Sequence, residues 1–394
     1  MLHIFKFHKY KYLLGMLLIV LGFALPLFVF EIAFRMFGPD WLDLRMREIS
    51  LNENVFFDTD YGWPIECSEI GCYKFVPNSE FLVSTNEYSH SVHIGSDGYR
   101  LNGNRISDFR KTIPFVGDSF TFGVGVEDHQ TFVSILERDS DNRYLNLGIP
   151  GNSIVQQIDI VKKRHDDLGR PNEYVFVFFL GNDFQNILES RLLAPGNFSD
   201  NIDLEDEEVD YYPTVSSNFS ILATINQFVI DNIFLRELYT VQWLRHKVLI
   251  LVNQSNADLM DPIFLMMRKD KEYLYESKSI FVDELRRLDD LADALDFQYA
   301  FLIVPDRHQI DSDLLKIRMD YYGIDSEDID YMLPNNVLSI LLDEHQITYI
   351  DPTECMKTQD NVNELFYILD NHLTAKGHAT MAKCVGNSIN DKLE

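Results

Sequence analysis

The chain is poor in positive charge. Its 394 residues include 34 Lys and Arg against 62 Asp and Glu, and the formal net charge at pH 7 is -28. Proteins that bind nucleic acid or anionic membrane surfaces do so with clustered Lys and Arg, because these neutralise phosphate groups. The composition therefore argues against both classes of partner.

Cysteine is also scarce. The four cysteines allow two short-range pairs, Cys67 with Cys72 and Cys355 with Cys384. Neither pair has the spacing of zinc ligands. An even number of cysteines is compatible with disulfides outside the cytoplasm, but the sequence leaves open whether either bond forms. We find no internal repeat and no low-complexity tract.

One long apolar stretch near the N-terminus lacks charge. Residues 12–30 carry none, and these 19 residues as a helix come close to spanning a hydrocarbon core of about 30 Å. Lys6, Lys9 and Lys11 precede the stretch, and by the positive-inside rule they remain in the cytoplasm. We therefore expect residues 1–38 to form a cytoplasmic tail and a single transmembrane helix in the inner (cytoplasmic) membrane. The rest of the chain would then be periplasmic or otherwise extracytoplasmic.

The alternative for this segment is a cleaved signal peptide, because residues 22–24 offer small side chains at the required spacing. The apolar run continues past Pro26 to Phe30 and is longer than the core of a signal peptide usually is. A retained anchor is the favoured interpretation.

Beyond the first hundred residues, short apolar runs alternate with helical patterns. The strand-like runs are residues 113–116, 143–149, 174–182, 299–305 and 347–351. Nearly continuous apolar strands that alternate with helices indicate a parallel sheet covered on both faces. The sequence predicts a doubly wound α/β core.

The predicted organisation has three parts. After the anchor, residues 39–110 are rich in aromatics and turns, and we expect them to wrap the core. Residues 111–394 form the α/β domain, with a helical insertion at about 187–279 that could cap the carboxyl edge of the sheet. The insertion contains the acidic stretch 203–210, which is typical of a solvated loop.

The first predicted strand, residues 113–116, is followed by Gly-Asp-Ser, which places Ser119 at the carboxyl edge of the sheet. Ligands of open α/β sheets bind at this edge, so the position suits a nucleophile. A serine that simply caps or turns the chain is the competing interpretation.

Polar residues follow the other strands in the same way. Gly151 comes after the second strand and Asn182 after the third, and Asp370 and His372 lie near the C-terminus. A neutral imidazole can take the proton of a serine hydroxyl, and a carboxylate can orient that imidazole. We expect Ser119, His372 and Asp370 to form a catalytic triad. The N–H groups of Ser119 and Gly151 and the Asn182 amide would form the oxyanion hole.

Neighbouring residues have simpler interpretations. Asp118 is expected to order the turn through backbone N–H groups, Asp183 to cap the following helix, and His378 to pack or cap. Asp370 could instead cap the helix that begins near Thr374, and His372 could be a surface histidine.

A metal site of Asp370, His372 and His378 has suitable ligand types but no supporting cluster, so no metal is expected. The residues 306–308 follow the fourth strand and are expected either to contact substrate or to lie in an exposed loop.

Four blocks in this order, "GDSF", "NLGIPGNS", "GND" and an Asp and His near the C-terminus, resemble the SGNH or GDSL hydrolase superfamily. The similarity covers about residues 111–186 and 297–386. The blocks "DYGWPIE", "SDGYR" and "FVGDSFTFGVGVEDHQTF" look like its membrane-anchored bacterial branch. In one respect the chain departs from the family pattern, which places the acid three residues before the histidine. Leu369 occupies that position here, and Asp370 makes the spacing two, which resembles polysaccharide O-acetyltransferase-like relatives.

The resemblance implies a three-layer, flavodoxin-like fold and metal-free, cofactor-free serine chemistry on esters. The expected protein is a membrane-anchored, extracytoplasmic serine esterase or O-acyltransferase that acts through an acyl-serine, with an acylated glycan of the cell envelope or an exported polysaccharide as substrate. The alternatives are a catalytically silent module that binds a glycan or an assembly partner, and a lipase or thioesterase.

Overall fold

The computed structural model describes residues 22, 25–51, 56–57, 65–68, 71–103, 111–192, 228–229, 232–252, 261–268 and 272–392. The acidic stretch 203–210 and residues 12–21, 23 and 24 of the predicted membrane anchor lie outside the described residues. Within the described part of the chain, no helix is both long and apolar enough to cross a bilayer.

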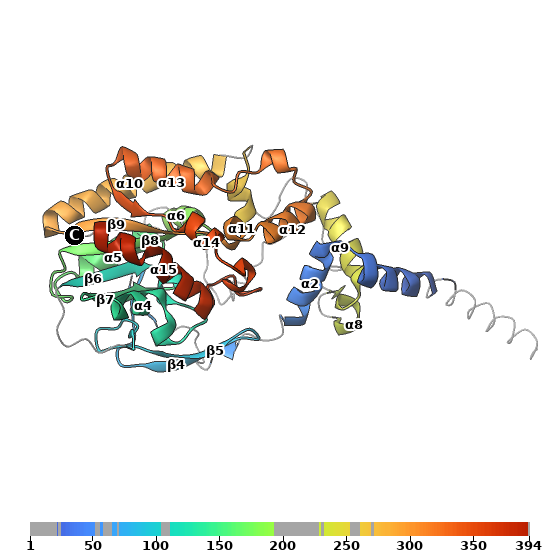
Figure 1. Cartoon of the computed structure of the whole chain (residues 1–394), viewed down its shortest axis with the longest axis horizontal. Helices are drawn as coiled ribbons and strands as arrows, with labels where there is room; N and C mark the ends of the chain where they lie inside the picture. Colours follow the sequence, from blue (N-terminus) through green and yellow to red (C-terminus); the bar gives the residue numbers. More distant parts are fainter. Residues whose placement is uncertain are drawn as a thin grey trace, which may run out of the picture. The chain divides into compact units, whose positions relative to one another are not determined.

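A five-stranded parallel sheet forms the centre of the larger part of the molecule (Figure 1). Its strands are β6 (Thr112–Gly117), β7 (Arg143–Gly148), β8 (Glu173–Phe179), β9 (Gln298–Val304) and β10 (Thr348–Ile350). They lie in the order β10-β9-β8-β6-β7. Counted along the chain this is 2-1-3-4-5, the flavodoxin-like order. The prediction of an α/β fold with a parallel sheet is confirmed, and the bounds of all five predicted strands agree with the structure to within three residues at each end.

Helices cover both faces of this sheet. One face packs against α5 (Ile154–Arg164), α6 (Asp183–Leu192), α10 (Glu272–Leu295) and α13 (Leu333–Glu344), and the other packs against α4 (Phe132–Arg138), α14 (Thr353–Lys357) and α15 (Ala375–Lys392). The described residues of this part also contain α3 (Ser119–Phe122), α11 (Arg307–Ile310) and α12 (Ser312–Tyr322), and short 3-10 helices at Asp128–Gln130, Pro262–Met266, Ser326–Asp328 and Val362–Glu364.

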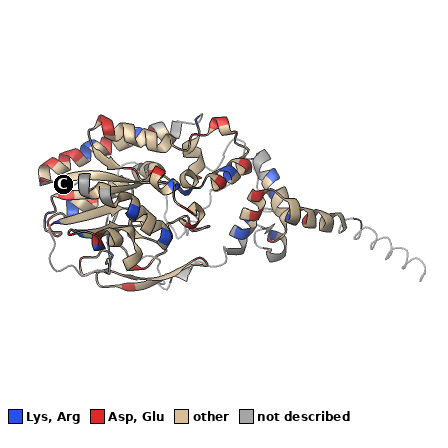
Figure 2. Cartoon of the chain, in the orientation of Figure 1, with Lys and Arg blue, Asp and Glu red and all other residues tan. Residues whose placement is uncertain are grey.

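The strands are apolar throughout because both of their faces are buried. In β8, Phe176 and Phe178 belong to the core on the α5 and α10 side, whereas Val175 and Val177 belong to the core under α4 and α15. Successive side chains of a strand point to opposite faces, so burial on both sides removes any polar alternation. In α10, Phe281 and Leu285 are buried in the core, whereas Asp283 and Arg286 are exposed. Figure 2 shows where Lys, Arg, Asp and Glu lie along the helices that cover the sheet.

The segment before β6 packs onto the same core. It contains the hairpin β2 (Ile65–Ser68) and β3 (Gly71–Phe75), and the antiparallel sheet of β1 (Phe56–Phe57), β4 (Glu80–Ser84) and β5 (Ser89–His93). Phe75, Phe81 and Val92 are buried in one cluster with Phe122 of α3. The hairpin and sheet thus cover the turn that follows β6.

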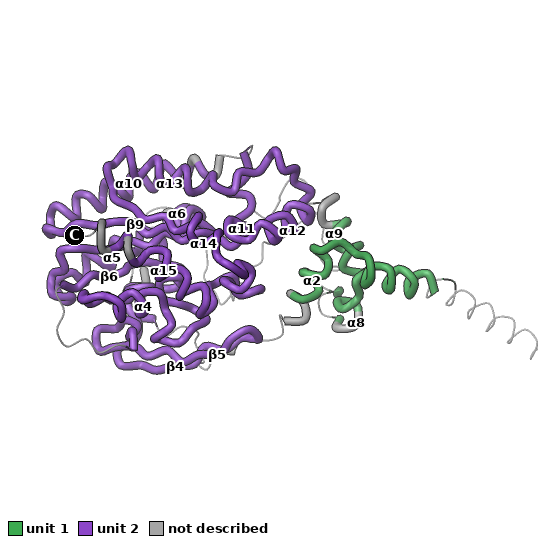
Figure 3. Tube along the Cα trace, in the orientation of Figure 1, with its two compact units in different colours: residues 1–53, 210–257 green, residues 54–209, 258–394 purple. Residues whose placement is uncertain are grey.

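The chain divides into two compact units (Figure 3). Residues 54–209 and 258–394 form the larger unit described above, and residues 1–53 and 210–257 form the smaller one. The division differs from the predicted boundaries, because part of the insertion joins the N-terminal segment rather than the α/β domain. Residues 39–53 likewise belong with the N-terminal segment and not with the wrapping region.

The smaller unit is helical. Residues 25–37 form a helix, followed by α2 (Asp40–Leu51), α8 (Ile233–Arg236) and α9 (Tyr239–Val252). The Glu31 carboxylate accepts hydrogen bonds from the backbone N–H of Tyr239 and Thr240, at 3.1 and 3.0 Å. An anion at the N-terminus of a helix is stabilised by the exposed N–H groups there. Aromatic contact of Trp41 with His246 adds to this packing, which explains why the inserted segment groups with the N-terminal residues.

The cysteines also have defined places. Cys355 and Cys384 form a disulfide that joins α14 to α15, with 5.8 Å between the Cα atoms. Cys67 and Cys72 are partners in the register of the β2–β3 hairpin.

Candidate active site

Ser119 lies where β6 ends and α3 begins. The Asp118 carboxylate caps this helix by accepting a hydrogen bond from Phe120 N–H at 2.9 Å, which confirms the expected role of Asp118 in the turn. A Cβ on Gly117 would lie 2.0 Å from Thr121 Oγ1, so only glycine fits where strand and helix meet. Ser119 is held in a fixed turn and is 9% exposed.

The histidine and the acid approach this serine from the loop before α15. His372 Nε2 lies 2.7 Å from Ser119 Oγ, and His372 Nδ1 is hydrogen-bonded to Asp370 Oδ1. The three side chains therefore form the Ser-His-Asp arrangement in which each group orients the next. The alternatives of a helix cap for Asp370 and a surface position for His372 do not apply. Thr374 Oγ1 caps α15 instead, accepting from Gly377 N–H at 3.1 Å.

The spacing of two residues works because of the conformation between them. Asn371 has φ of 65°, in the left-handed region that Asn tolerates better than most residues. The loop closes on itself, with Tyr367 N–H donating to His372 O at 2.9 Å and a bridge between Phe366 and Leu373. The tight loop lets Asp370 reach the imidazole although only one residue separates them.

Opposing effects set the pKa values of His372 and Asp370. Burial lowers the pKa of His372, but the Asp370 charge and hydrogen bond, with a contribution from Asp118, outweigh it and raise that pKa above its ordinary value. Burial likewise raises the pKa of Asp370, but His372 and the hydroxyl of Tyr88 more than compensate and the net pKa is lowered. Asp370 is therefore a carboxylate over the whole physiological range of pH.

The expected oxyanion residues follow the strands on either side of β6. Gly151 comes after β7, has φ of 82°, and is exposed, with no atom within 4 Å of the place where a Cβ would be. Asn182 comes after β8, half-buried, and the Oδ1 of its side chain is buried without a hydrogen-bond partner. From β6 the chain first adds β7 on one side and then β8 on the other, so the order in which strands are added reverses between β6 and β8. Ser119 and Asn182 therefore flank the topological switch point, where open sheets bind ligands.

A second carboxyl group is buried behind the nucleophile. Asp183 does not cap α6 as expected, because its Oδ2 accepts from Phe179 N–H at 2.8 Å and so holds the end of β8. Burial raises the pKa of Asp118 to about 6, and burial together with the charge of Asp118 raises that of Asp183 well above its usual range. Above about pH 6 Asp118 therefore carries the negative charge of this pair, and that charge favours the protonated form of Asp183 beside it.

Other predicted residues have structural roles. His378 accepts from Phe132 N–H through Nδ1 at 3.2 Å and caps α4, as expected. The residues after β9 are buried, so the expectation of an exposed loop there is wrong. Asp306 caps α11 by accepting from His308 N–H at 2.9 Å, and Arg307 donates to the carbonyls of Tyr367 and Ile368 in the loop that carries the acid.

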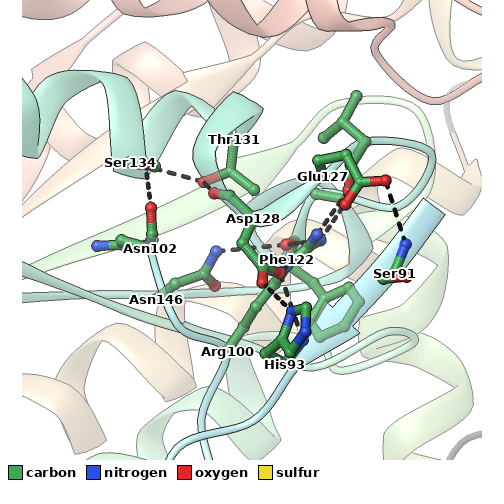
Figure 4. A network of polar contacts seen from close by, with 12 residues as sticks. Ser91, His93, Arg100, Asn102, Phe122, Glu127, Asp128, Thr131, Ser134 and Asn146 are labelled. Carbon is green, nitrogen blue, oxygen red and sulfur yellow. Dashed lines mark hydrogen bonds and ion pairs between the residues drawn. The ribbon is translucent and has the colours of Figure 1, made fainter. Parts of the chain in front are cut away.

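Arg100 secures the turn that follows the nucleophile (Figure 4). Its guanidinium is fully buried, pairs with Asp128 at 2.9 Å, and donates to the carbonyls of Phe122 and Gly123 at 2.9 and 2.7 Å. Burial lowers the pKa of Arg100 and Asp128 opposes that shift. Arg100 is the last residue of "SDGYR", one of the blocks that carried the resemblance, yet its contact with the nucleophile turn was not predicted.

Two residues that the sequence analysis missed contact the acid–base loop, which we define as residues 366–373. Glu87 accepts hydrogen bonds from the backbone of the loop, and the Tyr88 hydroxyl donates to Asp370 Oδ2. Both lie more than 280 positions before the residues that they contact, in a segment expected only to wrap the core.

No model of a known protein family and no curated protein matches the chain. Similar solved structures include a member of the lipolytic protein G-D-S-L family from Veillonella parvula, with 12% identity over 70% of this chain and 95% of that one at a TM-score of 0.35. A lipase/acylhydrolase from Enterococcus faecalis has 12% identity over 72% of this chain and 97% of that one, with a TM-score of 0.34. A variant of an acetyl-xylooligosaccharide esterase from Geobacillus Stearmophilus has 13% identity over 71% of this chain and 94% of that one, with a TM-score of 0.33. At these values the similarity carries no argument about function, which has to rest on the geometry of the site.

Proposed function

We propose that the protein is a serine enzyme that acts on carboxylic esters through an acyl-serine intermediate. The observation that carries the proposal is the 2.7 Å distance from His372 Nε2 to Ser119 Oγ, with Asp370 bound to the opposite nitrogen of the imidazole. A nucleophile, a base within hydrogen-bond reach and an orienting carboxylate are the groups that acyl transfer needs.

In the first half of the reaction, Ser119 Oγ attacks the acyl carbon while His372 Nε2 takes its proton. Asp370 fixes the proton on Nδ1 and stabilises the imidazolium that forms. The negative charge on the former carbonyl oxygen would be held by the N–H groups of Ser119 and Gly151 and by the Asn182 amide. The loss of one such donor typically costs about 10² to 10³ in rate. His372 then protonates the leaving alkoxide, and the acyl-serine remains.

In the second half, His372 removes a proton from the acceptor hydroxyl, which attacks the acyl carbon, and Ser119 regains its proton when the intermediate collapses. Water as acceptor makes the protein an esterase, and a sugar hydroxyl makes it an O-acyltransferase. Both outcomes use the same residues. The raised pKa of His372 means that kcat/KM should increase with pH through a value above the 6.5 of an unperturbed imidazole.

The alternatives draw less support from the site. A silent binding module has no need for the contact between the serine and the histidine. A lipase would need an apolar groove beside Ser119, but the neighbouring Phe120 is part of the core. Its ring stacks on that of Phe179 with 3.7 Å between the centroids, and the residue is 3% exposed.

For the location, we propose a single-pass anchor in the cytoplasmic membrane with the α/β unit on the extracytoplasmic side. Support comes from the uncharged run 12–30, the lysines before it, and the exposed apolar side chains of the helix 25–37, among them Phe28 at 63% and Phe30 at 57%. An acylated glycan of the envelope or an exported polysaccharide would be the substrate within reach of such an enzyme. Alkaline phosphatase fused to the C-terminus should be active in this topology and inactive if the C-terminus is cytoplasmic.

The test of the activity is hydrolysis of p-nitrophenyl acetate by the detergent-solubilised full chain beside Ser119→Ala and His372→Ala. Because members of a triad act as a unit, each variant should lose about 10⁴-fold or more in kcat, by similar factors. Equal trace rates in all three proteins would remove the basis of the proposal.

A further inference from the structure

The turn between β4 and β5 meets the acid–base loop although the two lie at opposite ends of the larger unit's sequence. The turn, residues 85–88, is held by Thr85, whose Oγ1 accepts from the N–H of Glu87 at 3.1 Å and of Tyr88 at 3.3 Å. These short-range bonds fix the backbone from which Glu87 and Tyr88 project.

Glu87 binds the backbone of the acid–base loop. Its carboxylate accepts from the N–H groups of Ile368 at 2.7 Å, Leu369 at 3.0 Å and Asp370 at 2.9 Å. Three successive N–H groups that point at one anion have no partner in a strand or helix here, so the carboxylate satisfies donors that would otherwise be unpaired. The position of Asp370 in space is thereby tied to Glu87.

Tyr88 acts on the acid itself. Its hydroxyl donates to Asp370 Oδ2, while Oδ1 of the same carboxylate binds His372. With one oxygen held on each side, the carboxylate has a single orientation. Burial and the charge of Asp370 raise the pKa of the Tyr88 hydroxyl, so it keeps its proton and remains a donor at every pH of interest. The ring of Tyr88 also packs on that of Tyr367, with 4.8 Å between centroids.

We propose that Glu87 and Tyr88 are positioning residues of the triad: Glu87 sets the backbone of the acid–base loop, and Tyr88 fixes the orientation of the Asp370 carboxylate that orients His372. The inference rests on the proposed function, because positioning matters only if the triad reacts. It makes the segment before β6 part of the catalytic machinery, and it accounts for how an acid two residues from the histidine is held in place.

The role of Tyr88 has a signature in pH. Its hydrogen bond draws on the negative charge of Asp370, and that charge stabilises protonated His372. Without the hydroxyl, the undiminished charge should raise the pKa of His372, so the acid limb of kcat/KM should move to higher pH. The other titratable groups that face the pair are Asp118, Glu87, His90, Tyr367 and His378, and Tyr88→Phe removes none of them.

The experiment compares Tyr88→Phe with Tyr299→Phe in the full chain. Tyr299 is a matched control because its hydroxyl also donates to a carboxylate, that of Asp289, elsewhere in the same unit. For Tyr88→Phe we expect kcat to fall by about 10-fold or more, KM to change by less than about 2-fold, and the acid limb to move upward. Tyr299→Phe should leave all three unchanged. Glu87→Gln, which places an amide against backbone donors, should also lower kcat, and thermal unfolding of each variant reports whether it is folded.

The outcomes separate the two proposals. If wild type hydrolyses the ester, Ser119→Ala does not, and Tyr88→Phe matches Tyr299→Phe in kcat and in the acid limb, the positioning role is overturned and the proposed function stands. A fall in kcat with an unmoved acid limb in Tyr88→Phe reduces its role to packing and also overturns the inference as stated for Tyr88. If Ser119→Ala hydrolyses as well as wild type, both proposals fail.

Discussion

The nucleophile turn, residues 117–123, and the acid–base loop bring their reactive groups together by different means. Several hydrogen bonds of the turn are short-range. The Asp118 carboxylate accepts from the N–H of Phe120, two residues later, and Gly123 N–H donates to Ser119 O at 2.9 Å. The acid–base loop depends on residues far away in the sequence, Glu87, Tyr88 and Arg307. A nucleophile can thus be recognised from a short motif, whereas the group that activates it is held by contacts that no short motif records.

The largest effect is expected from Arg100, a long-range support of the nucleophile turn. Arg100→Ala would remove the guanidinium from Asp128, which would keep only its contact with His93, and from the buried carbonyls of Gly123 and Val126. Breaking a buried ion pair costs about 3–5 kcal/mol. Chemical denaturation measures the loss in the free energy of unfolding. Arg170→Ala, which removes an exposed pair with Asp166, should cost less than about 1 kcal/mol. Equal losses in the two variants would show that Arg100 does not support the turn.

Gly117→Ala tests the short-range part of the comparison. The added methyl group would meet Thr121 and Val177, and overpacking of this kind costs about 1–3 kcal/mol and should displace Ser119. We expect lower stability and a larger fall in kcat than the loss of stability explains. Gly386→Ala in α15 is the control, because its nearest heavy atom would be 3.7 Å away. Full activity of Gly117→Ala would contradict the tight junction of strand and helix.

Asn371 tests the acid–base loop in the same way. Its left-handed backbone costs a residue with a Cβ about 1–2 kcal/mol, and a β-branched residue should fit worst. Asn371→Gly should therefore keep most of the activity, while Asn371→Val should lose activity and stability. The ratio of kcat values for the two variants is the measurement. A ratio near one would mean that the loop does not require this conformation.

These contrasts also explain how much of the molecule the sequence predicts. Apolar strands such as 174–179 identify the sheet, because burial on both faces leaves a continuous signal. The triad residues were identified from blocks with a fixed order, and Asp118 and His378 have the expected roles. Glu87 and Tyr88 were missed because a glutamate and a tyrosine in a turn have no local property that reveals a partner 280 residues later. The pairing of residues 210–257 with the N-terminal segment depends on tertiary contacts such as Glu31 with Tyr239 and was missed for the same reason.

The smallest expected effect is the change of stability with pH that is due to Asp118, the buried carboxyl group of the nucleophile turn. Since the pKa of Asp118 is about 6 in the folded protein and near 3.9 in an unfolded chain, the folded state binds the extra proton between these values. Stability then falls as pH rises through about 4 to 6. Asp118→Asn keeps the capping oxygen and removes this titration, so its melting temperature relative to wild type should increase between pH 4 and pH 6. The raised pKa of His372 acts in a separate window above 6.5 and also lowers stability as pH rises. A difference in melting temperature that does not vary with pH would contradict the raised pKa of Asp118.

The central claim, that His372 and Asp370 activate Ser119, is tested most directly by the reaction of the full chain with a fluorophosphonate, followed by peptide mass spectrometry. The account predicts one phosphonyl group on Ser119 in wild type, and a rate of modification that falls steeply in His372→Ala because the hydroxyl then has no base. Modification of another residue, or equal rates in wild type and His372→Ala, would contradict it.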